Sequence, residues 1–180
     1  MDQFNGMDYT QVEIMHSELM KRIILIISWD FGKRAIKMKV SQNFTIQEFV
    51  PRSIFNKYGG NSAWFIDPRI VKLMQVMRDQ AGVPITVNNW HTRGPLQNRG
   101  YRTPGSKVGA FYSQHKRGVA VDFNVQGMTS KEVFDWVMRE SQLFISLGVT
   151  TIEDWNFTAN WTHLDLRWRS EREGIVIVKP

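Results

Sequence analysis

The sequence contains no cysteine among its 180 residues. Disulfide bonds, cysteine-based zinc ribbons and thiol catalysis are therefore excluded. Any metal ion must instead be bound by histidine, aspartate or glutamate. The absence of cysteine is compatible with either redox compartment, so it does not locate the protein.

Long hydrophobic runs are also missing. The longest apolar stretch covers residues 23–27, far below the ~20 residues that a membrane-spanning helix needs. Lys21 and Arg22 precede this stretch as in a signal peptide, but Asp30 follows closely and no small-residue cleavage site is present. We therefore expect neither a membrane span nor a signal peptide.

Charge is unbalanced, because 23 lysine and arginine residues stand against 17 aspartate and glutamate residues, a net charge of +6. A basic surface suits an anionic partner such as nucleic acid, a membrane surface or a bacterial cell wall. No block of lysine and arginine is dense enough to predict nucleic acid, and we expect no such partner. A soluble protein that is basic without an anionic partner explains the charge equally well.

The sequence does contain enough apolar residues, 42% of the chain, for one folded domain. We place this domain at residues 41–180 and interpret residues 1–40 as an N-terminal extension, with Met38 as an alternative natural start. We expect a helix or a strand in the extension, which either packs on the domain or docks onto a partner protein. The apolar residues of the extension that recur at helical spacing are Val12, Met15, Leu19, Ile23 and Ile26.

Start signals predict helices within the domain. Residues 45–48 and 129–132 both read as capping boxes, in which a threonine and a glutamate satisfy each other's backbone amides. Asp67 followed by Pro68 predicts the clearest helix, and Gly82 ends it. The helix that starts at residue 129 is expected to end before Gly148.

Strand patterns cover residues 84–88, 117–125 and 161–168, and the tail at 175–178 is predicted to be an edge or pairing strand. Residues 91–112 carry no periodicity, and a loop of that length in a small domain usually contributes to a site. Together these elements predict an α+β domain, with helices packed on an antiparallel sheet.

Alternation along two of these strands places polar residues together. Ala120 and Asp122 share one face of the first strand, which small neighbours keep open, whereas His163 and Asp165 share one face of the second. If the two strands are neighbours, these faces can coincide. With His115 just ahead of the first strand, His115, Asp122 and His163 form a plausible ligand set for a catalytic zinc ion, which keeps one position open for water.

These residues lie in a pattern that resembles peptidase family M15, the zinc D-Ala-D-Ala carboxypeptidases and L-Ala-D-Glu endopeptidases. The resemblance covers roughly residues 40–170 and is closest to phage and prophage members, the endolysins. It includes residues 88–90 and 99–102. The two motifs that carry it are Ser113-x-His115-x-x-Gly118-x-Ala120-x-Asp122 and Trp161-x-His163-x-Asp165.

The resemblance implies the fold shared by DD-peptidases and the Hedgehog signalling domain, with zinc bound by His115, Asp122 and His163. It also implies an arginine ahead of the first histidine that stabilises the oxyanion, for which we assign Arg102, with Arg99 as the next choice. The residues expected to contact the substrate are Ser113, Arg99, His91 and Trp161. His91 is also the alternative metal ligand if one of the three assigned ligands is wrong.

One position departs from the family. Many members carry a glutamate three residues before the last histidine as general base, and Asn160 occupies that position here. An asparagine side chain cannot accept the proton, so the base must come from elsewhere. Glu153 and Asp154 are the nearest acids, and we assign Glu153, provided that its strand pairs with the strand of His163. Asp165 is expected to orient a ligand.

The sequence thus predicts a zinc metallopeptidase that hydrolyses a bond next to alanine in peptidoglycan stem peptides, in phage lysis or entry. Without a signal peptide, such a protein stays in the host cytoplasm until release or is carried in a virion. The alternative is a non-catalytic zinc-containing binding module on the same fold, attached to a phage particle as a structural protein through residues 1–40.

Overall fold

The structure is a computed structural model that describes residues 38–158, 160–170 and 174–180. The element expected within residues 1–40 falls almost wholly outside this part of the chain, so the boundary at residue 41 stays a prediction. The described helices are α2 (Arg52–Tyr58), α3 (Pro68–Ala81), α4 (Ser130–Arg139) and α5 (Ser141–Ser146). The short 3₁₀ helices are η1 (Ile46–Glu48), η2 (Gly59–Phe65), η3 (Trp90–Thr92) and η4 (Gln114–Arg117).

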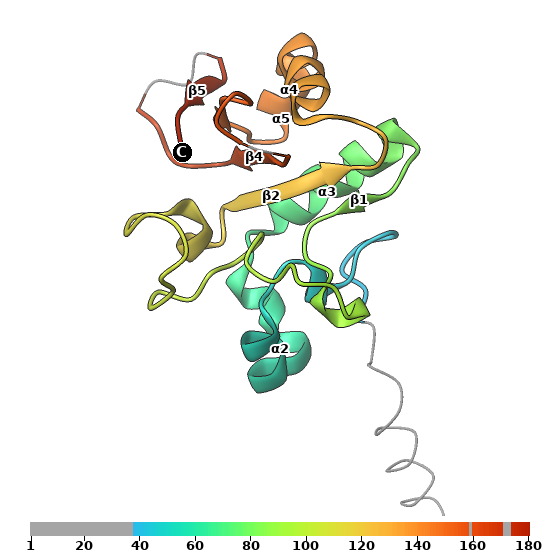
Figure 1. Cartoon of the computed structure of the whole chain (residues 1–180), viewed down its shortest axis with the longest axis vertical. Coiled ribbons are helices and arrows are strands. Elements are labelled where there is room, and N and C mark those ends of the chain that lie inside the picture. Colours follow the sequence, from blue (N-terminus) through green and yellow to red (C-terminus); the bar gives the residue numbers. More distant parts are fainter. Residues whose placement is uncertain (1–37, 159, 171–173) are drawn as a thin grey trace, which may run out of the picture. The chain divides into compact units, whose positions relative to one another are not determined.

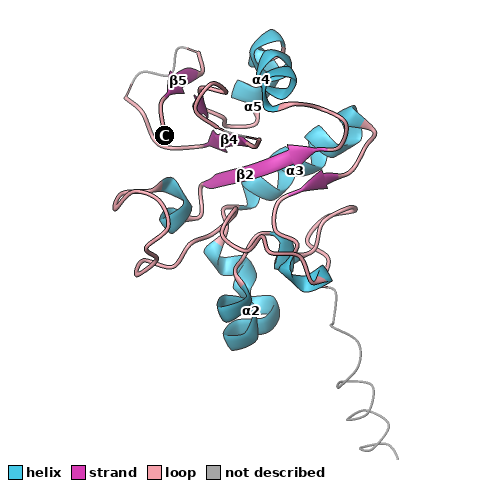
Figure 2. Ribbon diagram, in the orientation of Figure 1, coloured by secondary structure: helices cyan, strands magenta, loops and turns pink. Residues whose placement is uncertain are grey.

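A single sheet organises the described chain (Figures 1 and 2). Its order is β1-β2-β4-β3-β5, and each neighbouring pair is antiparallel except β3 with β5, which is parallel. The α+β prediction is confirmed, and the sheet is antiparallel as predicted except where the tail adds the parallel edge strand β5. The strands are β1 (Ile85–Thr86), β2 (Ala120–Val125), β3 (Thr151–Glu153), β4 (Thr162–Asp165) and β5 (Val176–Val178).

One face of the sheet is covered by helices. Helix α3 contacts β2 and helix α4 contacts β4, and in Figure 1 α3 runs behind β2. The apolar stripe of α3 is buried, and the alternate residues Val121 and Phe123 of β2 are buried in the same core. Asp122 of β2 and His163 and Asp165 of β4 therefore point to the opposite face of the sheet.

The helix ends follow the predicted signals. Asp67 accepts a hydrogen bond from the backbone amide of Arg69 at 2.9 Å, and Gly82 ends α3 with a φ of 66°. Both capping boxes are present. The helix predicted to run from residue 129 towards Gly148 is instead divided into α4 and α5, because Glu140 has a non-helical backbone with a φ of −103° and a ψ of 29°.

Strand lengths differ more from the sequence pattern. The strand predicted at residues 84–88 keeps only two residues in β1, because the Asn88 amide donates to the Glu48 carbonyl at 3.1 Å and the chain turns towards η1. The strand predicted at 161–168 is β4, four residues long.

The loop at residues 91–112 lies beside β2 and η4. The Asp122 amide donates to the Arg99 carbonyl at 2.7 Å, and the Arg102 amide donates to the His115 carbonyl at 3.1 Å. The Tyr101 amide donates to the Phe49 carbonyl at 2.7 Å. The loop is thus attached to the two segments that carry predicted metal ligands, as its position in the sequence suggested.

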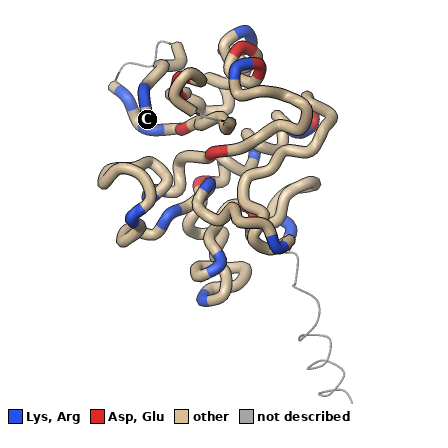
Figure 3. The backbone as a smooth tube through the Cα atoms, in the orientation of Figure 1, with Lys and Arg blue, Asp and Glu red and all other residues tan. Residues whose placement is uncertain are grey.

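The surface of the described part of the chain carries charge without strong segregation. Figure 3 shows lysine and arginine on helices, loops and the C-terminal segment alike. Among the described residues, no helix has both the length and the apolar character that a bilayer crossing requires.

Candidate metal centre

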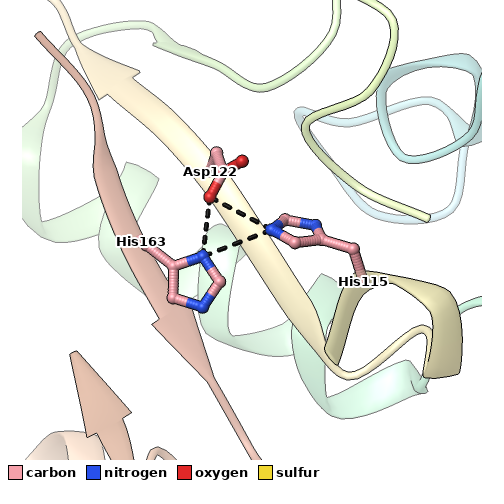
Figure 4. A group of neighbouring side chains, drawn as sticks. All are labelled: His115, Asp122 and His163. Carbon is pink, nitrogen blue, oxygen red and sulfur yellow. Dashed lines mark hydrogen bonds and ion pairs between the residues drawn. The ribbon is translucent and has the colours of Figure 1, made fainter. Parts of the chain in front are cut away.

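Three elements bring the candidate ligands together (Figure 4). His115 projects from η4, Asp122 from β2 and His163 from β4. The register of the sheet places Asp122 directly opposite His163. The two strands are therefore sheet neighbours with a shared polar face, as the alternation required.

The three side chains face one another at close range. Asp122 Oδ1 lies 2.7 Å from His163 Nδ1 and 3.2 Å from His115 Nε2, and the two ring nitrogens are 3.2 Å apart. All three residues are buried. The structure thus holds a cluster of two imidazoles and one carboxylate that could bind a metal ion.

Each imidazole has a hydrogen-bond acceptor on the side that faces away from the cluster, and this acceptor determines which nitrogen carries the proton. His115 Nδ1 donates to the Gly100 carbonyl at 2.7 Å, and His163 Nε2 donates to Asp165 Oδ2 at 3.2 Å. A carbonyl and a carboxylate only accept, so each ring carries a proton on the nitrogen that faces away from the cluster. In a neutral ring, the nitrogen that faces the cluster is then a free lone pair, which is the form that binds metals.

This arrangement fits a cation. Three acceptor atoms converge with no donor among them, and such a site needs either an added proton or a metal ion. Burial alone would lower the pKa of His163, but hydrogen bonds to Asp122 and Asp165 outweigh it and raise that pKa to about 9. Burial likewise opposes the charge of Asp122, yet hydrogen bonds to both histidines hold its pKa well below the ordinary value.

The small residues of the first motif are needed because larger side chains would not fit at their positions. Gly118 ends η4 with a φ of 71°, and a β-carbon there would lie 2.0 Å from the Phe65 carbonyl oxygen. Ala120 stands opposite Asp165 and is buried on the face that carries Asp122. Gly100 has no room either, since a β-carbon would lie 2.1 Å from the Phe49 carbonyl oxygen.

Arg102 lies at the cluster, where its side chain binds the Asp122 carboxylate. Its Nη2 donates to Asp122 Oδ2 at 2.7 Å, and its Nε donates to the Asn98 carbonyl at 2.6 Å. The guanidinium therefore fixes the second carboxylate oxygen and turns Oδ1 towards the histidines. Arg99 instead donates to the Asn124 side chain.

Glu153 is the acid that the structure brings to the cluster. β3 pairs with β4 so that Ile152 faces Leu164, and Glu153 Oε1 lies 3.8 Å from His163 Nδ1. Burial raises the pKa of Glu153 above its ordinary value. The condition set for Glu153, pairing of its strand with that of His163, is met. Asn160 is exposed, and its carbonyl accepts from the Asn124 side chain.

A cavity of about 450 Å³ opens onto the cluster. Arg102 and Glu153 line it together with the three candidate ligands. Among the residues expected to contact substrate, Ser113 and Trp161 line this cavity, whereas Arg99 and His91 do not. His91 lies on η3 with its ring 5.8 Å from that of Trp90.

Sequence reasoning missed two contributors. Gly100 lies in the stretch 99–102 that belongs to the family resemblance, but the residue type does not reveal that its backbone carbonyl accepts a hydrogen bond from His115. Arg167 donates from its amide, Nε and Nη2 to Asp165, whose pKa hydrogen bonds lower to about 2 against the opposing effect of burial. The alternation that put Arg167 on the face of His163 and Asp165 was the available signal.

Comparisons of the chain with protein-family models, with curated proteins and with solved structures found no match.

Proposed function

We propose that this protein is a zinc-dependent peptidase of the M15 type, on the Hedgehog/DD-peptidase fold, which hydrolyses a stem-peptide bond next to alanine in peptidoglycan. One observation carries the proposal. Two imidazole nitrogens and a carboxylate oxygen converge at 2.7 to 3.2 Å, beside a half-buried acid, Glu153, that is not needed as a ligand.

Zinc suits these donors. Two histidine nitrogens and one carboxylate oxygen leave a fourth position, and this is the donor pattern of catalytic rather than structural zinc sites. Zinc bound there would supply a water of lowered pKa as the nucleophile. The hydrogen bonds to Gly100 and Asp165 orient both rings, as the outer partners of metal-binding histidines commonly do.

The remaining residues have distinct roles in this proposal. Glu153 accepts the proton of the attacking water, and its raised pKa brings it closer to the pH at which a base works well. Arg102 fixes Asp122 and lines the cavity, where its positive charge stabilises negative charge on the carbonyl oxygen of the substrate. Burial of the cluster strengthens each of these interactions.

The substrate class is supported by the motifs and by charge. Arg102 and Arg167 line the cavity but are paired with Asp122 and Asp165, and Lys179 adds a further positive charge that favours a ligand with a carboxylate, such as a stem peptide. The proposal places the protein in phage lysis or entry, acting on the cell wall after release or from a virion.

The test uses purified sacculi. Protein loaded with one equivalent of zinc should release free peptide or alanine from the sacculi, and a chelator should stop the release until zinc is restored. Mass analysis of the products identifies the bond that is cut. If zinc binds with one-to-one stoichiometry and neither peptide nor alanine is released from sacculi under any condition, the peptidase proposal is wrong.

We predict that Glu153→Gln lowers the hydrolysis rate by about 100-fold or more, because the amide cannot accept the proton. Zinc stoichiometry should not change, since Glu153 is not among the three clustered ligands. Asp154→Asn is the matched control, because Asp154 is adjacent in sequence but is absent from the cavity lining. Equal rates for Glu153→Gln and the parent protein would remove Glu153 as the base.

A second candidate is a non-catalytic zinc-binding module, favoured by Asn160 at the position where many family members carry the base. This candidate predicts zinc binding and retention on sacculi without product release. It also predicts that Glu153→Gln leaves retention unchanged.

A further inference from the structure

Two aromatic side chains stand exposed beside the candidate metal centre. Phe111 is 79% exposed and Tyr112 is 77% exposed, on the loop between Arg102 and Ser113. Large apolar side chains that are exposed together usually mark a contact surface. We call Phe111 and Tyr112 the aromatic pair.

The aromatic pair is attached to the metal centre by short-range contacts. The Ser113 amide donates to the Ala110 carbonyl at 3.1 Å, and the Lys116 amide donates to the Ser113 carbonyl at 3.0 Å, in the segment that leads to His115. Lys116 Nζ also lies 5.5 Å from the centre of the Phe111 ring. The pair is therefore held at a defined place relative to the metal cluster.

The neighbouring part of the loop lies on Arg102. A β-carbon at Gly109 would come within 2.5 Å of Arg102 Nη1, and Gly109 has a φ of 76°. Gly109 and Tyr112 both line the metal cavity, whereas Phe111 lies outside it. A ligand that fills the cavity and extends past Tyr112 therefore reaches Phe111 next.

The two rings pack edge to face, with their centroids 4.8 Å apart and their planes at 89°. Because both side chains are still more than three-quarters exposed, each ring keeps surface open to a ligand. A pyranose ring suits such exposed aromatic surface, because its axial C–H groups carry partial positive charge and are attracted to the negative face of an aromatic ring. Ser113 and Gln114, which also line the cavity, provide polar groups for sugar hydroxyls.

We propose that the aromatic pair binds the glycan strand that carries the peptide held in the metal cavity. This inference rests on the proposed function, in which the cavity holds a stem peptide attached to a glycan. The pair then makes the protein prefer polymeric or disaccharide-bearing substrates over free peptides. Phe111 and Tyr112 act as binding residues for the polymer and take no part in the chemistry.

The first experiment measures glycan binding without hydrolysis. A soluble β-1,4-linked N-acetylglucosamine hexamer is titrated into the full chain in the presence of a chelator. We expect Phe111→Ala and Tyr112→Ala to weaken its binding roughly three- to tenfold each. Trp64→Ala is the matched control, because Trp64 is 90% exposed and is absent from the lining of the metal cavity. It should bind the hexamer as the parent protein does.

The second experiment compares hydrolysis of a free stem peptide with that of a disaccharide-linked stem peptide. Phe111→Ala, at the member of the pair that lies outside the cavity, should show a raised KM for the disaccharide-linked peptide alone, with kcat unchanged for both. If no peptide is cut by any form of the protein, the proposed function fails, while glycan binding still decides the present inference.

Three results would overturn the role of the aromatic pair. The parent protein could fail to bind the hexamer, the variants could bind it as well as the parent, or the KM for both substrates could rise equally. Binding of the parent, but not the double variant Phe111→Ala/Tyr112→Ala, to phosphatidylcholine–phosphatidylglycerol vesicles in place of the hexamer would assign the pair to a bilayer surface instead.

Discussion

Asp165 is fully buried, and it holds His163 from the side opposite to Asp122. Its charge is balanced by Arg167, so the site contains a chain of contacts from Arg167 through Asp165 to His163. This chain keeps the proton of His163 on Nε2 and leaves Nδ1 to face the cluster. The chemistry of the ligand is thus set by a residue that does not touch the cluster centre.

We therefore predict that Asp165→Asn weakens zinc binding by about 10- to 100-fold, the usual effect of removing an outer partner of a ligand histidine. Competition with a chromophoric chelator measures the zinc Kd. Asp135→Asn, on the exposed surface of α4, should leave the Kd unchanged. An unchanged Kd in a folded Asp165→Asn protein would show that the ring is oriented by other contacts.

Gly118 is a second single residue that the fold requires, because it has no side chain to collide with Phe65. We predict that Gly118→Ala lowers the free energy of unfolding by more than about 3 kcal/mol, because it combines backbone strain with a collision against Phe65. Gly127→Ala separates the two effects: Gly127 has a φ of +80° and nothing within 4 Å of its β-carbon position. It should cost only about 1 to 2 kcal/mol. Urea unfolding of both variants is the measurement, and equal losses would contradict the steric account.

At the scale of elements, α3 shows how a helix start supports the site. Asp67 caps α3, and its own backbone amide donates to the Gly118 carbonyl at 3.0 Å, at the end of the turn that carries His115. The side-chain hydrogen bond from Arg69 holds the pKa of Asp67 below its ordinary value. The cap therefore contributes stability that depends on pH.

Asp67→Ala should lower the free energy of unfolding by about 1 kcal/mol at neutral pH, where the carboxylate is ionised in the folded and unfolded chain. Because the folded pKa is depressed, this contribution is complete above about pH 4, the unfolded pKa, and is lost as the pH falls through the lower folded pKa. Urea unfolding at neutral and acidic pH should show the difference between parent and variant shrinking. Asp67→Asn keeps a cap without the charge, so its stability relative to Asp67→Ala should not vary with pH in the same window.

Elements were predictable from the sequence where a local signal decides them. Caps, the Asp-Pro helix start and strand alternation are properties of a few adjacent residues, and α3, both capping boxes and residues 120–125 of the strand predicted at 117–125 follow them. The lengths of β1 and β4 and the break at Glu140 depend on partners that are distant in sequence. Propensity patterns do not contain those partners, and tertiary contacts override them.

At the scale of the whole molecule, the metal cluster joins segments that lie 41 residues apart. The alternation in two strands was sufficient to predict that Asp122 and His163 can share a face. That prediction held only if the two strands are neighbours in the sheet, which the sequence does not show. Glu153 depended on a further pairing, between β3 and β4. The Gly100 carbonyl could not be found, because a backbone group that holds a ligand leaves no residue type to recognise.

A site assembled from distant segments links metal binding to folding. A metal ion that binds the folded cluster and not the unfolded chain stabilises the fold by about 2.7 kcal/mol at a concentration of 100 times the Kd. For a chain of this size, we predict that zinc raises the Tm by roughly 5–10 °C and that a chelator reverses the rise.

His115→Ala should abolish the shift, because the cluster loses one of its three ligands. His91→Ala should keep it, since the structure holds His91 on η3 and outside the cluster. Scanning calorimetry with and without zinc distinguishes these outcomes: a shift lost in His91→Ala would make His91 a ligand, and a shift retained in His115→Ala would place the metal elsewhere.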